Sequence, residues 1–321
     1  MAGARTLRVL ITGAAGNLGG LLARHLLPRE VALRLMHHRR PLARDLLDSR
    51  SVEPVQADLG KPETLAAAVA GVDVVVHFAG VLFAPRPERF LPETNGRWFD
   101  NLLTASLEAR VRRVILISFP HVEGPTTIAA PATGRLDREP VSVHARTRLE
   151  DERSLFRRTP GTGTTPVVLR LGMVYGRGVL MVDAARWLAV RRLLAVWREP
   201  TWIQLVSTTD GMSAIEAAIV GAEVQGIYHV GDEQPVTLQE FLDQACRVWG
   251  CPAPRRLPLW AIELAAGLCE AFALVARTAS PLTRDFVRIG RVPYWGDTSR
   301  LRRELLPQLA HPTLASGLRT L

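Results

Sequence analysis

A glycine-rich turn near the N-terminus carries the residues best suited to chemistry. The apolar run 7–11 leads into residues 12–20, which read Thr-Gly-Ala-Ala-Gly-Asn-Leu-Gly-Gly. This pattern predicts a strand that feeds a tight turn and then a helix. Glycines let the backbone approach a ligand closely, and a helix N-terminus offers N–H groups without intrahelical partners. Such a turn therefore cradles the pyrophosphate of a nucleotide cofactor.

The elements that must position this turn follow an alternating pattern. Short apolar, β-branched runs are separated by segments with helical spacing, such as 17–27, 61–70 and 97–108. This alternation predicts an α/β fold, a doubly wound parallel sheet of Rossmann type with helices on both faces. The expected strands are residues 8–12, 32–36, 52–56, 72–77, 113–118, 167–171 and 226–230.

The alternation weakens after Gly172, where a second, smaller unit is expected. Helices are predicted at 184–197 and 238–249, the second opened by a capping box of Thr237 and Glu240. A proline-punctuated linker, 252–258, then precedes a long apolar helix and a basic tail. We expect a Rossmann domain at 1–172, to which 207–231 returns. The C-terminal substrate lobe is then formed by 173–206 and 232–321.

The net charge does not indicate a nucleic-acid partner. The 321 residues carry a formal charge of +9, but Lys61 is the single lysine and the other 39 basic residues are arginines spread along the chain. No basic block is interleaved with aromatic residues, and no nucleic-acid-binding module is evident. A small-molecule substrate is the expected partner.

Three cysteines and the N-terminal sequence indicate a cytoplasmic protein. Cys246, Cys251 and Cys269 have no metal-ligand spacing and are odd in number, which favours reduced, buried thiols and no metal site. The first apolar run is too short for a signal peptide and leads straight into the glycine turn. Glu263 and Glu270 interrupt the longest apolar stretch, so no segment of transmembrane length is expected.

Six ordered motifs resemble those of one enzyme family. Thr-Gly-x-x-Gly-x-x-Gly at 12–19 is followed by Ala-Asp-Leu at 57–59, His-Phe-Ala-Gly at 77–80 and Asn95. The last two motifs are Leu-Arg-Leu-Gly-Met-Val-Tyr-Gly-Arg-Gly at 169–178 and Tyr-His-Val-Gly-Asp at 228–232. The chain resembles the extended short-chain dehydrogenases/reductases, which include nucleotide-sugar epimerases, dehydratases and 3β-hydroxysteroid-type dehydrogenases. The resemblance spans nearly the whole length.

The resemblance implies a set of cofactor-binding residues. Gly13, Gly16 and Gly19, with Asn17 and Leu18 between them, would hold the pyrophosphate. Asp58 would bond the adenine amino group, with Leu59 beside the ring. Ala79 and Gly80 would line the ribose. Two alternatives are open: the glycines could form a tight strand-to-helix turn with no ligand, and Asp58 could be the N-cap of a helix ahead of Lys61.

The residues after the second strand favour NADP over NAD. An NAD-selective site places an acid there to bond the ribose 2′-hydroxyl, but the chain reads His37-His38-Arg39-Arg40 and has no acid until Asp45. His37 lies at the cofactor edge, and Arg39 or Arg40 could make charge-assisted bonds to a 2′-phosphate. The alternative is a solvated basic turn, with NAD as cofactor.

The catalytic residues usual in the family are replaced. Its tyrosine and lysine lie four residues apart on one helix face, and a serine or threonine completes the site. The chain has His144 at the tyrosine position, Arg148 at the lysine position and Phe119 at the hydroxyl position. Ser118, one residue earlier on a strand end, is expected to point to the opposite side.

Three hypotheses follow from these replacements. In the first, His144 shuttles the proton because an imidazole titrates near pH 6.5, and Arg148 bonds the cofactor's ribose. In the second, the proton is handled by His121, which stands where family dehydratases carry a catalytic acid. In the third, the protein binds its cofactor without catalysis, as a sensor or scaffold.

The apolar helix at 258–277 also has alternative interpretations. Its residues Trp260, Leu264, Leu268, Phe272 and Val275 could line a hydrophobic pocket. They could also contact a membrane surface peripherally, helped by the nearby arginines, among them Arg277. The third alternative is a buried structural or dimer helix. A homodimer is expected only by analogy with the family.

The leading hypothesis is an NADP-preferring oxidoreductase or epimerase-like enzyme with a substituted active site. It would act on a carbonyl or alcohol of a small, lipophilic substrate. The alternative from another class is a catalytically silent NAD(P)-binding protein.

Overall fold

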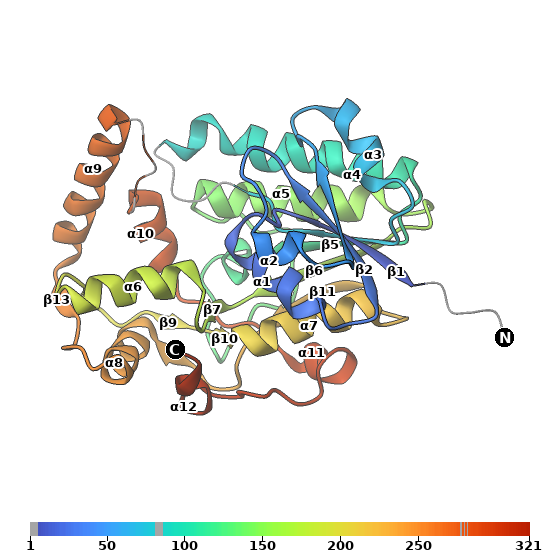
Figure 1. Cartoon of the computed structure of the whole chain (residues 1–321). Coiled ribbons are helices and arrows are strands. Elements are labelled where there is room, and N and C mark those ends of the chain that lie inside the picture. Colours follow the sequence, from blue (N-terminus) through green and yellow to red (C-terminus); the bar gives the residue numbers. More distant parts are fainter. Residues whose placement is uncertain (1–5, 81–85, 277, 279, 281) are drawn as a thin grey trace.

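A seven-stranded parallel sheet forms the centre of the molecule (Figure 1). The computed structural model describes residues 6–80, 86–276, 278, 280 and 282–321. The strand order is β11-β6-β5-β4-β1-β2-β3, and every pairing within this sheet is parallel. The predicted Rossmann-type fold is therefore confirmed. The strands are β1 Leu7–Thr12, β2 Val31–His37, β3 Val52–Gln56, β4 Val74–His77, β5 Arg113–Ser118, β6 Thr165–Leu171 and β11 Gly226–Val230.

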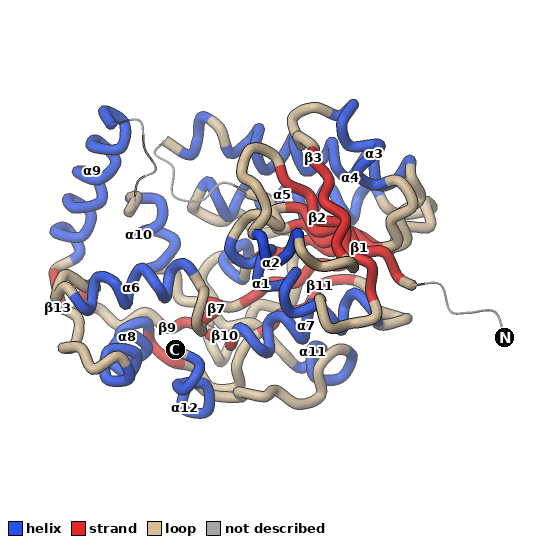
Figure 2. The backbone as a smooth tube through the Cα atoms, in the orientation of Figure 1, coloured by secondary structure: helices blue, strands red, loops and turns tan. Residues whose placement is uncertain are grey.

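Helices cover both faces of the sheet because successive strand residues point to opposite sides. Val9 and Ile11 pack in one buried cluster with α1 (Asn17–Leu26) and α7 (Thr208–Val220). Leu10 packs in the other cluster, whose helices are α3 Leu65–Val69, α4 Trp98–Glu108 and α5 Val143–Arg158. Figure 2 shows these helices flanking the strands.

The second half of the chain adds a lobe built on short strand pairs. β7 pairs with β10, β9 with β12, and β8 with β13. Its strands are β7 Met173–Tyr175, β8 Ala195–Trp197, β9 Trp202–Ile203, β10 Leu205–Ser207, β12 Val236–Thr237 and β13 Arg255–Leu257. The remaining helix in the N-terminal half of the chain is α2 Arg44–Leu47. Those in the C-terminal half are α6 Leu180–Val190, α8 Leu238–Val248, α9 Leu259–Ala276, α10 Arg284–Gly290, α11 Ser299–Glu304 and α12 Leu314–Gly317.

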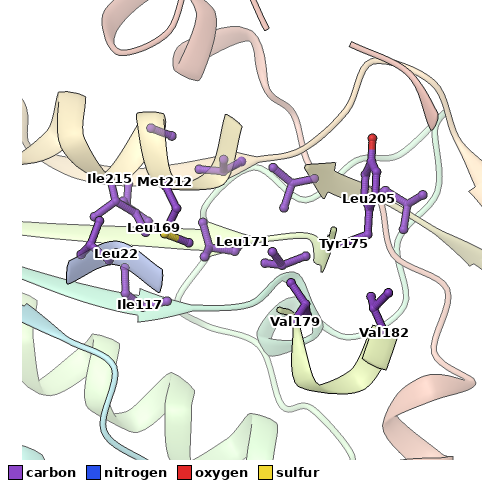
Figure 3. Packing of buried hydrophobic residues seen from close by; sticks show 14 of the residues in the cluster. Leu22, Ile117, Leu169, Leu171, Tyr175, Val179, Val182, Leu205, Met212 and Ile215 are labelled. Atoms are coloured by element: carbon purple, nitrogen blue, oxygen red, sulfur yellow. The ribbon is translucent and has the colours of Figure 1, made fainter. Parts of the chain in front are cut away.

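One buried core joins the sheet to the lobe (Figure 3). Leu22 of α1 and Leu169 of β6 belong to the same cluster as Tyr175, Val182 and Leu205 of the lobe. The division of the chain at residue 172 therefore stays a prediction, since buried side chains run across it without a break.

The helix predicted at 184–197 is wrong in its second half. The helix α6 ends at Val190, and Arg192 takes a left-handed conformation with φ 60°. Residues 195–197 instead form β8, which pairs with β13 inside the segment expected to be a linker. Val196 and Trp197 are buried in this pairing, so tertiary packing overrides the helical pattern. The capping box of Thr237 and Glu240 at the start of α8 is confirmed.

The long helix α9 is largely exposed, which contradicts its interpretation as a buried structural helix of the chain, while the dimer-helix alternative stays a prediction. Val275 is 85% exposed and Trp260 68%, and the other expected pocket-lining residues are exposed as well. By length and composition α9 could also cross a membrane, contrary to the sequence-based expectation. Arg277, expected at its end, lies outside the described residues. Of the three cysteines, only Cys246 is buried.

Candidate active site

The glycine turn between β1 and α1 is shaped by close backbone contacts. Gly13 has φ +73°, and a Cβ there would lie 3.0 Å from the backbone nitrogen of Ala79. The Gly16 N–H donates to the Gly13 carbonyl at 2.8 Å, and a Cβ at Gly16 would meet that oxygen at 2.9 Å. A Cβ at Gly19 would meet the Gly13 carbonyl carbon at 2.9 Å. No side chain caps α1, so its first N–H groups are available to an anion.

The side chains of Asn17 and Leu18 turn away from this anion site. Asn17 Nδ2 donates to the Gly178 carbonyl at 2.5 Å, and its Oδ1 accepts from the Leu180 N–H at 2.9 Å. Leu18 packs against the core. These two residues contribute backbone to the turn, while Asn17 ties the turn to the start of α6.

A cavity of about 250 Å³ extends from the turn along the carboxyl ends of β1, β2 and β3. It brings together most of the cofactor residues expected from the sequence. Its lining residues are Thr12, Gly13, Ala15, Gly16, Met36, His37, His38, Arg39, Arg40, Ala57, Asp58, Leu59, Ala79, Gly80 and Trp98. Its place beside the point where the strand order reverses is where dinucleotides bind in this fold class.

Asp58 is the one acidic side chain among these lining residues. Its Oδ1 accepts from the Gly60 N–H at 2.9 Å, and its Oδ2 lies 3.3 Å from His38 Nε2. The Asp58 side chain thus caps a turn. The helical segment that follows has Lys61, and not Asp58, as its N-cap. The helix N-cap interpretation of Asp58 is therefore wrong.

Trp98 is a lining residue that sequence reasoning missed. Its Nε1 is buried, has no hydrogen-bond partner among the residues that the structure describes, and lies 3.0 Å from the Cβ position at Gly60. The signal for it was Asn95, one of the family motifs, which comes three residues earlier. Asn95 itself is buried, with Oδ1 unpartnered and 3.6 Å from the Cβ position at Gly80.

The helix α5 places His144 and Arg148 on one face, one turn apart. Ser142 caps this helix by accepting from the Ala145 N–H at 3.1 Å. Arg148 is buried, and its Nη2 lies 3.0 Å from the Cβ position at Gly80. Its Nη1 lies 3.3 Å from the buried Asp151 carboxylate. Arg148 thus reaches the end of the cavity that Gly80 lines.

Four rings gather beside Arg148. His144 stacks on Phe119 with ring centroids 5.1 Å apart and planes at 18°. His121 lies 5.7 Å from Phe119 and 4.2 Å from Tyr294, which comes from the C-terminal lobe. Within the described ranges, both ring nitrogens of His121 and Nδ1 of His144 are buried without hydrogen-bond partners. Such atoms are costly unless a ligand completes their hydrogen bonds, so they indicate a binding site.

Both imidazoles are held neutral, which corrects the expectation of titration near pH 6.5. Burial, together with the nearby Arg148 charge and His121, lowers the pKa of His144 to about 3. Burial alone lowers the pKa of His121 to about 3. A neutral imidazole donates an N–H hydrogen bond at neutral pH but carries no positive charge.

Asp151 lies beneath Arg148 and was not anticipated from the sequence. Burial raises the pKa of Asp151 to about 7, while the Arg148 charge opposes that rise. Its two carboxylate oxygens have no hydrogen-bond partner in the described part of the chain. Where the family pattern has a single lysine charge, this chain therefore has the Arg148 charge, which Asp151 partly compensates.

A buried charged network, also missed from the sequence, supports this region. Arg170 of β6 is fully buried and pairs with Glu123 and with Glu152, at 2.6 Å in the second case. His229 of β11 lies 3.3 Å from Glu123. The hydroxyl of Ser118 donates to Glu152, which lies on α5, the helix that also carries His144. The network fixes β5, α5 and β6 relative to one another.

Metal binding finds no support at this site. Among the residues that the structure describes, no cluster of three or more His, Cys, Asp or Glu side chains could hold a metal ion.

Comparisons with known proteins agree with this geometry. Residues 13–152 match a family described as NAD(P)H-binding. The chain is 26% identical to a 4-hydroxy-2-methyl-3-oxo-4-farnesyl-3,4-dihydroquinoline-1-oxide ketoreductase of Stigmatella aurantiaca, with 93% of this chain and 91% of that protein covered. It is 29% identical to a ceramide reductase of Caulobacter vibrioides, over 85% and 80% of the two chains. The fold matches a dTDP-glucose 4,6-dehydratase from Streptomyces venezuelae solved with NAD, at a TM-score of 0.78, 21% identity and coverage of 98% and 95%.

Proposed function

Because the chain is an NAD(P)-binding member of the extended short-chain dehydrogenases/reductases, we propose that it reduces a ketone of a lipophilic substrate with NADPH. The observation that carries this proposal is the placement of His144 and Arg148. Both lie on one face of α5, and Arg148 reaches Gly80 at the end of the nucleotide cavity.

The residues present fit a dinucleotide. The uncapped N-terminus of α1 and the cradle of Gly13, Gly16 and Gly19 would hold the pyrophosphate. Asp58, Leu59 and Ala79 would line the adenosine side, and Arg148 would bond the ribose hydroxyls beside Gly80. When bound, the reduced nicotinamide supplies a hydride.

His144 is the proposed proton donor. Its neutral imidazole donates an N–H hydrogen bond to the substrate carbonyl oxygen, which becomes more negative as the carbonyl carbon gains the hydride. The oxygen then takes this proton to become the alcohol, and His144 regains a proton from solvent. The sum is one ketone, one hydride and one proton giving one alcohol. A neutral histidine can stabilise a developing oxyanion in this way.

His121 and Tyr294 are assigned to the substrate side of the ring cluster. The unpartnered nitrogens of His121 would accept a hydrogen bond from a polar group of the substrate or donate one to it. Phe119 offers an apolar surface where the family places a hydroxyl. A lipophilic substrate agrees with this surface and with the names of the two related reductases, one for a farnesylated quinoline oxide and one for ceramide.

The preference for NADPH is tested at Arg39 and Arg40. Both side chains are exposed at the cavity beyond β2, and the one acid among the lining residues of this cavity is Asp58, which faces His38. Replacing both by alanine is expected to raise the Kd for NADPH about 10- to 100-fold and to leave the Kd for NADH unchanged, since one or two charge-assisted bonds to a 2′-phosphate are lost. Fluorescence titration measures both constants. Arg50→Ala, an exposed arginine outside the cavity, is the control, and an equal loss for both cofactors would contradict the preference.

The role of His144 is tested by two substitutions. His144→Ala is expected to lower kcat about 10²- to 10³-fold, the usual worth of a positioned acid or base. His144→Gln keeps an N–H donor and should recover part of this loss. Both variants should bind NADPH as the wild type does, because cofactor binding rests on other residues.

Two results would overturn the catalytic proposal. Unchanged turnover in His144→Ala would exclude this residue as the donor. Tight NADPH binding with no turnover on any ketone of an aliphatic, aromatic and isoprenoid panel would identify a silent cofactor-binding protein.

We also propose a cytoplasmic location and, by analogy with the family alone, a homodimer. Sedimentation velocity of the full chain tests the second proposal.

A further inference from the structure

Large exposed hydrophobic side chains are concentrated on two segments. Of the seventeen that are exposed in the described part of the chain, eleven lie in α6 with its following turn or in α9. They are Leu180, Met181, Trp187, Val190, Leu193, Trp260, Leu264, Leu268, Phe272, Leu274 and Val275. Exposed apolar patches of this size mark interaction surfaces.

The inner face of α9 is fixed to the protein. Ile262, Ala266 and Ala273 are buried, and Glu270 accepts from the Arg284 backbone N–H at 2.8 Å and from its Nε at 2.9 Å. The outer residues recur every three or four positions from 260 to 275, so they form one stripe. The helix has eighteen residues, which gives an apolar ridge about 27 Å long.

The end of α6 adjoins the start of α9. The Arg255 N–H donates to the Leu194 carbonyl at 3.0 Å, immediately after the turn that follows α6. The strands β8 and β13 then pair directly, and α9 begins two residues beyond β13. Figure 1 shows the end of α6 meeting the start of α9 at β13.

Arginines flank this apolar surface. Arg186, Arg191, Arg192 and Arg255 are exposed, and the one exposed acid in 180–193 and 255–276 is Asp183. Arg191 stacks over Trp187, with its guanidinium carbon 3.9 Å from the ring centroid. Together with Asp183, Arg186 and Val190, these two side chains line a shallow depression of about 300 Å³.

We propose that the surface formed by α6 and α9 docks on an anionic phospholipid membrane. Apolar side chains with arginines around them are the composition of a helix lying in a membrane interface, where basic residues strengthen attachment to an anionic surface. A second copy of the chain, seated face to face, would instead bring two sets of these arginines together, which like-charge repulsion disfavours.

The docked helix lies on the membrane and does not cross it. Crossing would expose the inner face of α9 to lipid, including the Glu270–Arg284 ion pair, and would strip the helix from α10 and β8. That rearrangement costs several kilocalories per mole for the charged pair alone.

Vesicle flotation of the full chain tests the proposal. The wild type is expected to float with vesicles of phosphatidylcholine and phosphatidylglycerol at low salt, and much less with phosphatidylcholine alone. Leu268→Gln with Phe272→Gln should weaken partitioning of the protein into vesicles at least about tenfold, because two apolar side chains that would enter the membrane are lost. Arg191→Gln with Arg192→Gln should remove most of the preference for the anionic lipid.

Matched controls separate docking from unfolding. Val220→Gln with Val248→Gln removes two exposed apolar side chains from α7 and α8 and should leave flotation unchanged. All variants should melt within a few degrees of the wild type and bind NADPH equally, so this test stands apart from that of the proposed reaction.

Four results would overturn the docking proposal. They are absence of flotation, flotation that survives the α9 substitutions, resistance of the bound protein to carbonate extraction, and a concentration-dependent dimer that the α9 substitutions abolish. The third would show a membrane-crossing helix, and the fourth a second copy of the chain on this face.

Discussion

Replacing Arg170 by methionine is expected to lower the free energy of unfolding by about 3–5 kcal/mol. Arg170 is fully buried between Glu123 and Glu152, which are also buried. Its loss leaves two carboxylates without their cation in a medium where an unpaired charge is expensive. Urea denaturation followed by circular dichroism measures the change, and many small domains would not survive it.

A charge-matched variant shows whether the loss is electrostatic. Adding Glu123→Gln and Glu152→Gln to Arg170→Met removes the stranded charges and should restore part of the stability. If the triple variant is less stable than Arg170→Met alone, the packing of these side chains, and not their charge, holds the site together.

Replacing Gly19 by alanine is expected to raise the Kd for NADPH about 10- to 100-fold. The added Cβ would meet the Gly13 carbonyl carbon at 2.9 Å, so the start of α1 must move away from the turn. Such a movement misplaces the N–H groups that face the pyrophosphate, and one lost bond to a charged group is worth about 1.5–3 kcal/mol. Fluorescence titration gives the constant directly.

Gly267 provides the control for this substitution. It lies in α9, and a Cβ there would meet nothing within 4 Å. Gly267→Ala should leave NADPH binding unchanged and raise the melting temperature slightly, because alanine favours a helix over glycine by about 1 kcal/mol. Equal NADPH affinity in Gly19→Ala and the wild type would show that the ligand does not use this turn.

Most of the sheet is predictable from the sequence because its signals are local. Apolar runs such as 74–77 predict strands by themselves, and the glycines after β1 predict the turn. The boundary near Arg192 is not local. The same apolar spacing continues from α6 into β8, and only the pairing of Val196 and Trp197 against β13 decides for a strand.

The chemistry of the site is less predictable because it depends on burial and on distant partners. Sequence position identifies His144 and Arg148, but the low pKa of His144 follows from neighbours that close over it. The network around Arg170 joins residues 118 to 229, and no spacing rule links them. The exposure of α9 likewise depends on which face meets α10, which an apolar sequence does not specify.

The side chain of Asn17 has a thermodynamic consequence for the whole molecule. It belongs to the nucleotide turn, yet both of its polar ends hold the backbone that opens α6, at Gly178 and Leu180. If a bound dinucleotide displaces this amide, the same displacement reaches α6, part of the proposed membrane-docking surface. Reciprocity then requires lipid contact to change the affinity for the dinucleotide by the factor by which the dinucleotide changes the affinity for lipid.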